Sequence, residues 1–213
     1  MDTTSIIILV FVMTIFTSLG GNSVHSPSSS KNFNQSNPTQ VEAPSTPVAV
    51  DNSLAKTVNP SYFGVVGENP RDSIYTFIAK YRNEFQAQSI TDALMRYSQQ
   101  YDVNPKLVAA LMSRESRFNP MAISSSGARG LGQLLPSTAQ GLGVTNSFDI
   151  EENCMGTVRY VKYLLDRFNK YGDQVSFALA SYLEGPNAVT RNKGYSTTTG
   201  RYVRDIIDSY YKI

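Results

Sequence analysis

Glu115 is the residue in this sequence best placed to do acid–base chemistry. Leu107, Leu111 and Glu115 are spaced four apart, and Met112 precedes Glu115 by three, so all share one face of a predicted helix. A carboxyl at the end of an apolar stripe is either solvated where the helix surfaces, or desolvated with a raised pKa. A desolvated carboxyl can donate a proton near neutral pH, as cleavage of a glycosidic bond requires. Periodicity alone leaves both interpretations open.

Composition excludes several other kinds of active centre. The 213 residues include one histidine, His25, and one cysteine, Cys154. His25 lies in a polar stretch expected to be disordered, which excludes a Ser-His-Asp, Cys-His or His-rich zinc centre in the folded part. One cysteine allows neither an intrachain disulfide nor a cysteine cluster. A net charge of +2 is too small to argue for nucleic acid, although it suits an anionic polymer. Carboxylates, hydroxyls, amides and lysines must carry any chemistry.

The segments that must position Glu115 are predicted to be helical. Apolar residues at helical spacing predict helices over 73–85, 89–101, 104–118, from 136, over 151–171, from 173 to a stop at 185–186, and over 201–211. Asn104 is the expected N-cap of the helix that carries Glu115, with Pro105 in its first turn. Asp173 can cap a later helix. Because strand-like alternation is scarce, we predict a mainly α fold.

The N-terminal third has a different composition. Residues 6–16 form an uncharged apolar run followed by small residues, so we predict a signal peptide over residues 1–21. The absence of a positive charge before the run, and the presence of Asp2, favour the alternative of an N-terminal anchor that tethers the chain to a membrane through residues 6–19. Residues 22–70, rich in Ser, Pro and Asn, are predicted to be a disordered tether. The folded domain is expected over 71–213.

Three sequence blocks give a more specific indication. The first reads Glu-Ser-Arg-Phe-Asn-Pro from Glu115, and the second is Ser124 with Gly-Ala-Arg-Gly-Leu-Gly-Gln-Leu-Leu-Pro-Ser-Thr from Gly127. The third is Ala-Ser-Tyr-Leu-Glu-Gly-Pro-Asn-Ala-Val from Ala180. In order and spacing, residues 88–213 resemble the catalytic domain of soluble lytic transglycosylases. That family implies a single helical domain of the lysozyme-like superfamily, of the goose-lysozyme/SLT type.

The resemblance assigns roles residue by residue. It implies that Glu115 is the catalytic acid and base, and that Ser124, Gln133, Tyr182 and Tyr202 bind the glycan. It implies peptidoglycan glycan strands as the substrate, with no metal, no cofactor and no nucleic acid. The enzyme is then expected to be exported to the periplasm or cell envelope. Secretion or division machinery is a further partner that such an enzyme would serve.

Three departures from the family pattern keep alternatives open. Gly132 replaces a methionine, which removes a side chain expected on the cleft floor, and Leu183 and Glu184 replace an asparagine and an alanine. A lysozyme-type hydrolase needs a second carboxylate, for which Glu184 is the candidate beside a matched block. Loss of the asparagine amide makes a non-catalytic glycan-binding or secretion-accessory module the other alternative. Because Tyr182 and Glu184 point about 200° apart on a helix, we predict that Glu184 faces away from Glu115.

Overall fold

A computed structural model describes residues 58–62 and 69–213. The helices in this part are α1 (Arg71–Ala79), α2 (Glu84–Tyr101), α3 (Pro105–Ser116), α4 (Pro136–Gly141), α5 (Ile150–Arg167), α6 (Gln174–Glu184), α7 (Pro186–Asn192) and α8 (Thr197–Tyr210). The only extended pairing in the described ranges is a pair of isolated bridges, which join Arg129 to Ile123 and to Leu134. The prediction of a mainly α fold is therefore confirmed.

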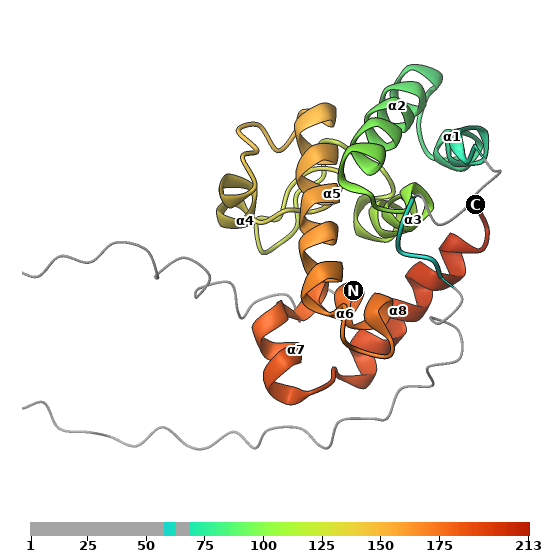
Figure 1. The fold of residues 1–213 in the computed structure, drawn as a ribbon. Coiled ribbons are helices and arrows are strands. Elements are labelled where there is room, and N and C mark those ends of the chain that lie inside the picture. Colours follow the sequence, from blue (N-terminus) through green and yellow to red (C-terminus); the bar gives the residue numbers. More distant parts are fainter. Residues whose placement is uncertain (1–57, 63–68) are drawn as a thin grey trace, which may run out of the picture. The chain divides into compact units, whose positions relative to one another are not determined.

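Helix α3 lies at the centre of this arrangement (Figure 1). It packs against α1, α2, α5 and α8, and every residue from Leu107 to Met112 is buried. As predicted, Asn104 caps it: its side chain accepts a hydrogen bond from the amide of Lys106 at 3.0 Å. The apolar stripe of α5 also points into the core, where α5 packs mainly on α2 and α6, while α8 is the main partner of α3. A helix buried on most of its circumference offers a rigid base for a side chain at its end.

The break between the helices predicted over 73–85 and 89–101 comes earlier than predicted. α1 ends at Ala79, and Asn83 starts α2 by accepting a hydrogen bond from the amide of Gln86 at 2.9 Å. Phe85 then falls in the first turn of α2, where 78% of it is exposed. Phe85 has the spacing of a core residue of the first helix, so the apolar pattern alone continues past Ala79. Asn83, a strong N-cap residue, instead starts a new helix.

The end of the domain also departs from the prediction. Gly185 and Pro186 do end α6, but Pro186 immediately begins α7, which the sequence analysis missed. Gly185 has a φ of 85°, which redirects the chain, and proline is well suited to a first helical turn. Helix α8 begins at Thr197 rather than at 201, because the Ser196 side chain caps it.

The predicted tether is wrong at its C-terminal end. Val58, placed in that tether, is 4% exposed and belongs to the main core. The carbonyls of Asn59 and Pro60 accept hydrogen bonds from the side-chain amide and the backbone amide of Asn104, at 2.8 and 2.9 Å. The same Asn104 amide donates to the Tyr210 hydroxyl at 3.4 Å. Residues 58–60 therefore pack against the helical domain, which composition alone could not show.

The predicted signal or anchor segment over 1–21 lies outside the described residues, as do residues 22–57 of the predicted tether. None of the helices described between Arg71 and Tyr210 combines the length and apolar character that a membrane span needs.

Candidate active site

Glu115 lies in the last turn of α3, where the buried part of the helix gives way to the surface. Its side chain is half-buried, while the preceding Arg114 is exposed. Helix α3 ends because Arg117 and Phe118 take left-handed backbone conformations, with φ of 51° and 58°. Phe118 is fully buried and packs edge-on against Phe77 of α1, with ring centroids 6.0 Å apart. Burial of this ring stabilises the turn that follows Glu115.

Tyr202 of α8 is the direct partner of Glu115. Its hydroxyl donates a hydrogen bond to Oε1 of Glu115, and the tyrosine is 4% exposed. Burial raises the pKa of Glu115 to about 7, although the Tyr202 hydrogen bond and the positive charge of Arg114 act to lower it. Arg114 also lies over the Tyr202 ring, 5.3 Å from its centroid, and pairs with Asp205 at 3.2 Å. These contacts join α8 to α3 beside Glu115. With a pKa of about 7, the Glu115 carboxyl is populated in both protonation states near neutral pH.

Tyr182 approaches the same region from α6. Its hydroxyl donates to the carbonyl of Gly132 at 2.7 Å, and its ring packs against Tyr160 of α5 with centroids 5.1 Å apart. Burial and then the negative charge of Glu115 raise the pKa of Tyr182 well above its ordinary value. Tyr182 therefore lies within electrostatic reach of Glu115 and stays a neutral donor at physiological pH.

Ser116, to which the sequence analysis gave no role, joins the end of α3 to the glycine-rich loop. Its hydroxyl donates to the carbonyl of Leu131 at 2.7 Å, with the Met112 carbonyl at 3.4 Å. With Tyr182 bonded to the next carbonyl, two successive carbonyls of the loop are held by side chains from α3 and α6. Its position directly after Glu115 in the first motif was the one sequence feature that could have indicated this role. Only the tertiary structure shows what the role is.

Ser124 and Gln133 both brace the loop. The Ser124 hydroxyl accepts a hydrogen bond from the amide of Ala128 at 3.0 Å. The Gln133 side-chain amide donates to the carbonyls of Gly130 and Ala122, at 2.9 and 3.3 Å. Gln133 itself has a φ of 52°, a conformation these bonds help to hold. Their predicted contacts with a glycan remain predictions.

The expectation that Gly132 removes a side chain from the cleft floor is wrong. A Cβ atom at this position would lie only 2.0 Å from the hydroxyl of Thr157 on α5, so position 132 faces another helix rather than an open floor. The amide of Gly132 donates to the side chain of Asn153 at 2.9 Å. Glycine allows the loop to lie directly on α5, and this contact holds the carbonyl that Tyr182 binds. Leu183, the other apolar departure, packs against the core.

The Glu184 carboxylate accepts hydrogen bonds from residues at the start of α8. Its Oε1 accepts hydrogen bonds from the Ser196 amide at 3.2 Å, from the Ser196 hydroxyl at 3.1 Å and from the Thr199 hydroxyl. Four further carboxylates also have structural partners: Asp149 caps α5, Glu151 pairs with Arg96, Glu152 accepts hydrogen bonds from residues 145–146, and Asp173 caps α6. Glu115, by contrast, is held by the buried Tyr202, and burial raises its pKa to about 7.

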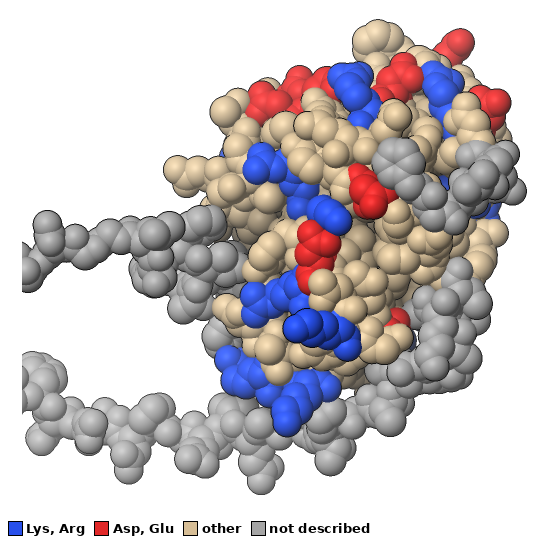
Figure 2. Space-filling view, in the orientation of Figure 1, with Lys and Arg blue, Asp and Glu red and all other residues tan. Residues whose placement is uncertain are grey.

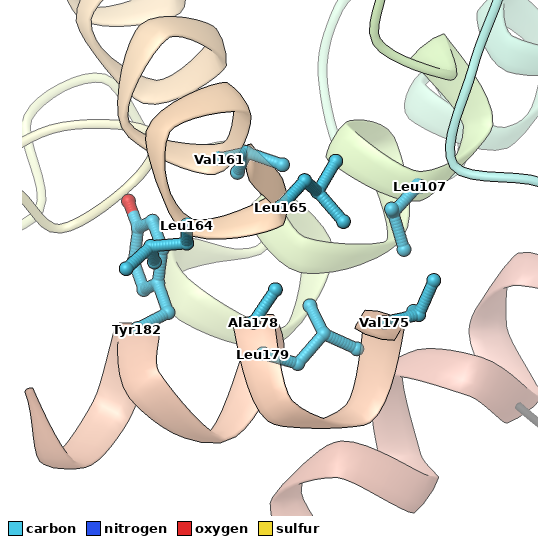
Figure 3. A pocket seen from close by; sticks show the side chains of 8 residues that line it. All are labelled: Leu107, Val161, Leu164, Leu165, Val175, Ala178, Leu179 and Tyr182. Atoms are coloured by element: carbon cyan, nitrogen blue, oxygen red, sulfur yellow. The ribbon is translucent and has the colours of Figure 1, made fainter. Parts of the chain in front are cut away.

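A small void lies next to Tyr182, between α3, α5 and α6 (Figure 3). It measures about 10 Å³ and is lined by the side chains of Leu107, Val161, Leu164, Leu165, Val175, Ala178, Leu179 and Tyr182. The Tyr182 oxygen points away from the other lining side chains. A space of this size and apolarity is a packing gap and cannot admit a sugar.

Comparison with known proteins identifies relatives for most of the helical part. A "Transglycosylase" of Enterobacteria phage PRD1 is 39% identical over 109 residues, covering 51% of this chain and 40% of that protein. A "Membrane-bound lytic murein transglycosylase F" of Pseudomonas savastanoi pv. phaseolicola is 30% identical over 159 residues, covering 67% of this chain and 30% of that protein. The chain therefore spans less than half the length of these relatives.

A solved structure shares the fold. It is an inactive mutant of lytic transglycosylase Slt from Pseudomonas aeruginosa, which superposes with a TM-score of 0.50 at 20% identity. The match covers 66% of this chain and 29% of that one, and it confirms the SLT-type lysozyme-like fold. The model of the "Transglycosylase SLT domain" family matches residues 92–204, which is more than half of the 213 residues. This range contains Glu115, Tyr182 and Tyr202, and the chain belongs to the transglycosylase SLT domain family.

Proposed function

We propose that this chain is a peptidoglycan lytic transglycosylase, which cleaves the MurNAc–GlcNAc β-1,4 bond and leaves 1,6-anhydromuramoyl ends. The observation that carries the proposal is the carboxyl of Glu115, half-buried at the end of α3, held by Tyr202 and with a pKa of about 7. Such a group is the proton donor that glycosidic cleavage needs at neutral pH. Family membership and the names of the relatives support the substrate class.

Glu115 would act twice in each turnover. Protonated, it donates its proton to the glycosidic oxygen as the bond to C1 of MurNAc breaks. Ionised, it then accepts the proton of the sugar's own C6 hydroxyl, whose oxygen bonds to C1. Glu115 ends protonated, no water is consumed, and a second carboxylate has no step to perform. The hydrogen bonds that Glu184 accepts from Ser196 and Thr199 support this one-carboxylate mechanism over the hydrolase alternative.

The charge distribution supports an anionic polymer as substrate. Figure 2 shows lysine and arginine side chains along α5 and around α7. The basic residues within or directly after these two helices are Arg159, Lys162, Arg167, Lys170, Arg191 and Lys193. Of the acidic residues on this helix face, Asp166 pairs with Lys162 at 2.9 Å. A local excess of positive charge attracts a carboxylate-bearing polymer and weakens with salt.

Mass spectrometry of sacculi digested by the full chain tests the proposal. We expect muropeptides lighter by one water than their reducing-end counterparts, and none from the Glu115→Gln variant. Reducing ends from the wild type would establish the hydrolase alternative. Binding to sacculi without any released product would establish a non-catalytic module.

We also propose that the protein is exported, with residues 1–21 as a signal peptide or retained anchor and residues 22–57 as a tether. The apolar run over 6–16 and the relatives named as membrane-bound support export to the cell envelope. Fractionation and N-terminal sequencing of the mature protein test it. A new N-terminus near residue 21 identifies a cleaved signal, whereas an intact Met1 in the membrane fraction identifies an anchor. Recovery of the full-length chain in the cytoplasm would contradict export.

A further inference from the structure

A concave site lies beside the glycine-rich loop, and Arg129 of this loop lines it. It is a hollow of about 470 Å³ between α4 and the segment that leads into α5. Its lining residues are Arg129, Pro136, Ala139, Gln140, Gly143, Val144, Thr145, Asn146, Ser147 and Phe148. Neither Glu115 nor its tyrosine partners line it. Its volume is within the usual range for small-ligand sites, which are roughly 300–1,000 Å³.

The hollow is held open by hydrogen bonds from α5. Glu152 accepts from the backbone amides of Thr145 and Asn146, at 2.5 and 2.9 Å. The Asn153 side chain donates to the carbonyls of Ser147 and Arg129, at 2.8 and 3.2 Å. Asn153 is fully buried, so both walls are fixed to one point of the core. A site whose walls are already ordered loses little entropy when a ligand binds.

Arg129 gives the hollow its chemical character. Its guanidinium lies 5.8 Å from the centroid of the Phe148 ring, and in the described residues it forms no ion pair with a carboxylate. The three acidic side chains at the start of α5 are already bound. Asp149 accepts from the amide of Glu152, Glu151 pairs with Arg96, and Glu152 accepts from the 145–146 backbone. A guanidinium held over an aromatic ring presents its fork of donors to a planar anion such as a carboxylate.

We propose that this hollow binds the carboxylate-bearing peptide stems of peptidoglycan, with Arg129 as the carboxylate contact and Phe148 as its support. The inference rests on the proposed function for the nature of the polymer. The position fits, because the segment from Arg129 to Gly132 lines the hollow at one end and accepts the Tyr182 hydrogen bond at the other. Three residue steps span at most about 11 Å, whereas an extended stem of four residues reaches about 13 Å. The hollow is thus within the reach of one extended stem from the loop carbonyl that Tyr182 binds.

A binding experiment tests the site without any turnover. The probe is the free tetrapeptide L-Ala-γ-D-Glu-L-Lys-D-Ala, titrated into the ¹⁵N-labelled chain, with amide shifts of residues 143–148 as the readout. We expect saturable shifts that weaken with added salt, and binding that is about threefold to tenfold weaker in Arg129→Gln. The matched control is Arg204→Gln, since Arg204 is an exposed arginine on α8, and it should bind like the wild type. Equal binding to Arg129→Gln, absence of saturable shifts in the wild type, or binding of glycerol phosphate without binding of the peptide would each overturn the assignment.

An activity experiment separates this inference from the proposed function. Glycan strands are prepared with their stems and, after amidase treatment, without them. We expect Arg129→Gln to raise KM on stem-bearing strands at unchanged kcat, and to match the wild type on stripped strands. An equal loss on both substrates would show that Arg129 acts on the loop and not on a stem. If the wild type cleaves neither substrate, the proposed function fails, while the titration still decides whether the hollow takes a carboxylate peptide.

Discussion

Glu115 and Glu184 both lie at the end of a helix that packs on α8, yet their surroundings differ. Glu115, at the end of α3, receives one hydrogen bond, from the Tyr202 side chain, and burial raises its pKa to about 7. Glu184, at the end of α6, receives three hydrogen bonds from Ser196 and Thr199 at the first turn of α8. One helix therefore supplies the partners of both carboxylates.

The two carboxylates differ in the number and kind of their hydrogen-bond donors. Several donors at a helix N-terminus stabilise the ionised form and connect one helix to the next. A single phenolic donor in an apolar setting leaves the ionised and protonated forms close in free energy. The four predictions that follow test this contrast, from the largest expected effect to the smallest.

Glu115→Gln should lower turnover by at least about 10²–10⁴-fold, because glutamine can neither donate nor accept the required proton. The thermal midpoint and binding to sacculi should change little, since glutamine keeps the shape and can still accept from Tyr202. Release of anhydro products over time is the measurement, with Glu184→Gln as the matched control. Retention of more than about a tenth of wild-type activity would remove Glu115 from the chemical step.

The stability of the domain should depend on pH through Glu115. Its folded pKa of about 7 exceeds its ordinary value of 4.5, so between these values the folded state binds more protons than the unfolded state. The free energy of unfolding therefore falls as the pH rises from about 4.5 to 7, by up to about 3 kcal/mol, and stays low above pH 7.

Urea denaturation at pH 5 and pH 8 measures this dependence. The difference between the two pH values should shrink in Glu115→Gln and persist in Glu184→Gln. The same pH difference in both variants and the wild type would mean that Glu115 is solvated in the folded protein.

Tyr202→Phe should lower the rate by about tenfold and shift the pH optimum upward. Removal of the hydroxyl takes away the one hydrogen bond that stabilises ionised Glu115, so its pKa should rise above about 7. The return of the proton in the second half of the reaction then requires a higher pH. The measurement is kcat against pH, with Tyr211→Phe, an exposed tyrosine, as the control. An unshifted profile would show that the hydrogen bond has no influence on the acid.

Glu184→Ala should change activity by less than about twofold and leave the products anhydro. The loss should appear in stability instead, by about 1 kcal/mol, because Ser196 and Thr199 lose an acceptor at the start of α8. Thermal unfolding and product analysis measure the two effects. A fall in activity like that of Glu115→Gln, with reducing-end products from the wild type, would favour the two-carboxylate hydrolase.

Local sequence features predicted much of the fold but little of the site's geometry. The Asn104 cap and the stripe that leads to Glu115 follow from helical spacing and capping chemistry, and both are confirmed in α3. The position of Tyr202 came from resemblance alone. Its contact with Glu115 joins residues 87 apart, and no local pattern encodes how α8 meets α3.

The errors have the same origin. Gly132 was interpreted as a gap in a cleft because sequence does not show that Thr157 of α5 lies against it. Near Asn83, apolar spacing favours a continuous helix and the N-cap residue favours a new one. At Pro186, the same Gly-Pro pair can end one helix or begin another. Packing decides both cases. The hollow at Arg129 depends on Asn153, which lies 24 residues away along the chain.

The attachment of Val58 to Ser61 has a mechanical consequence. This segment is fastened at Asn104, the N-cap of the helix that carries Glu115, and Asn104 also contacts Tyr210 near the end of the chain. A pulling force on the chain upstream of Val58 would therefore be borne first at Asn104, before it reached α1. The backbone of α3 connects Asn104 to Glu115 over about 16 Å, at 1.5 Å per residue, and would transmit this force. Tension applied upstream of Val58 would act on the N-terminal end of α3, and a rigid helix would carry it to Glu115.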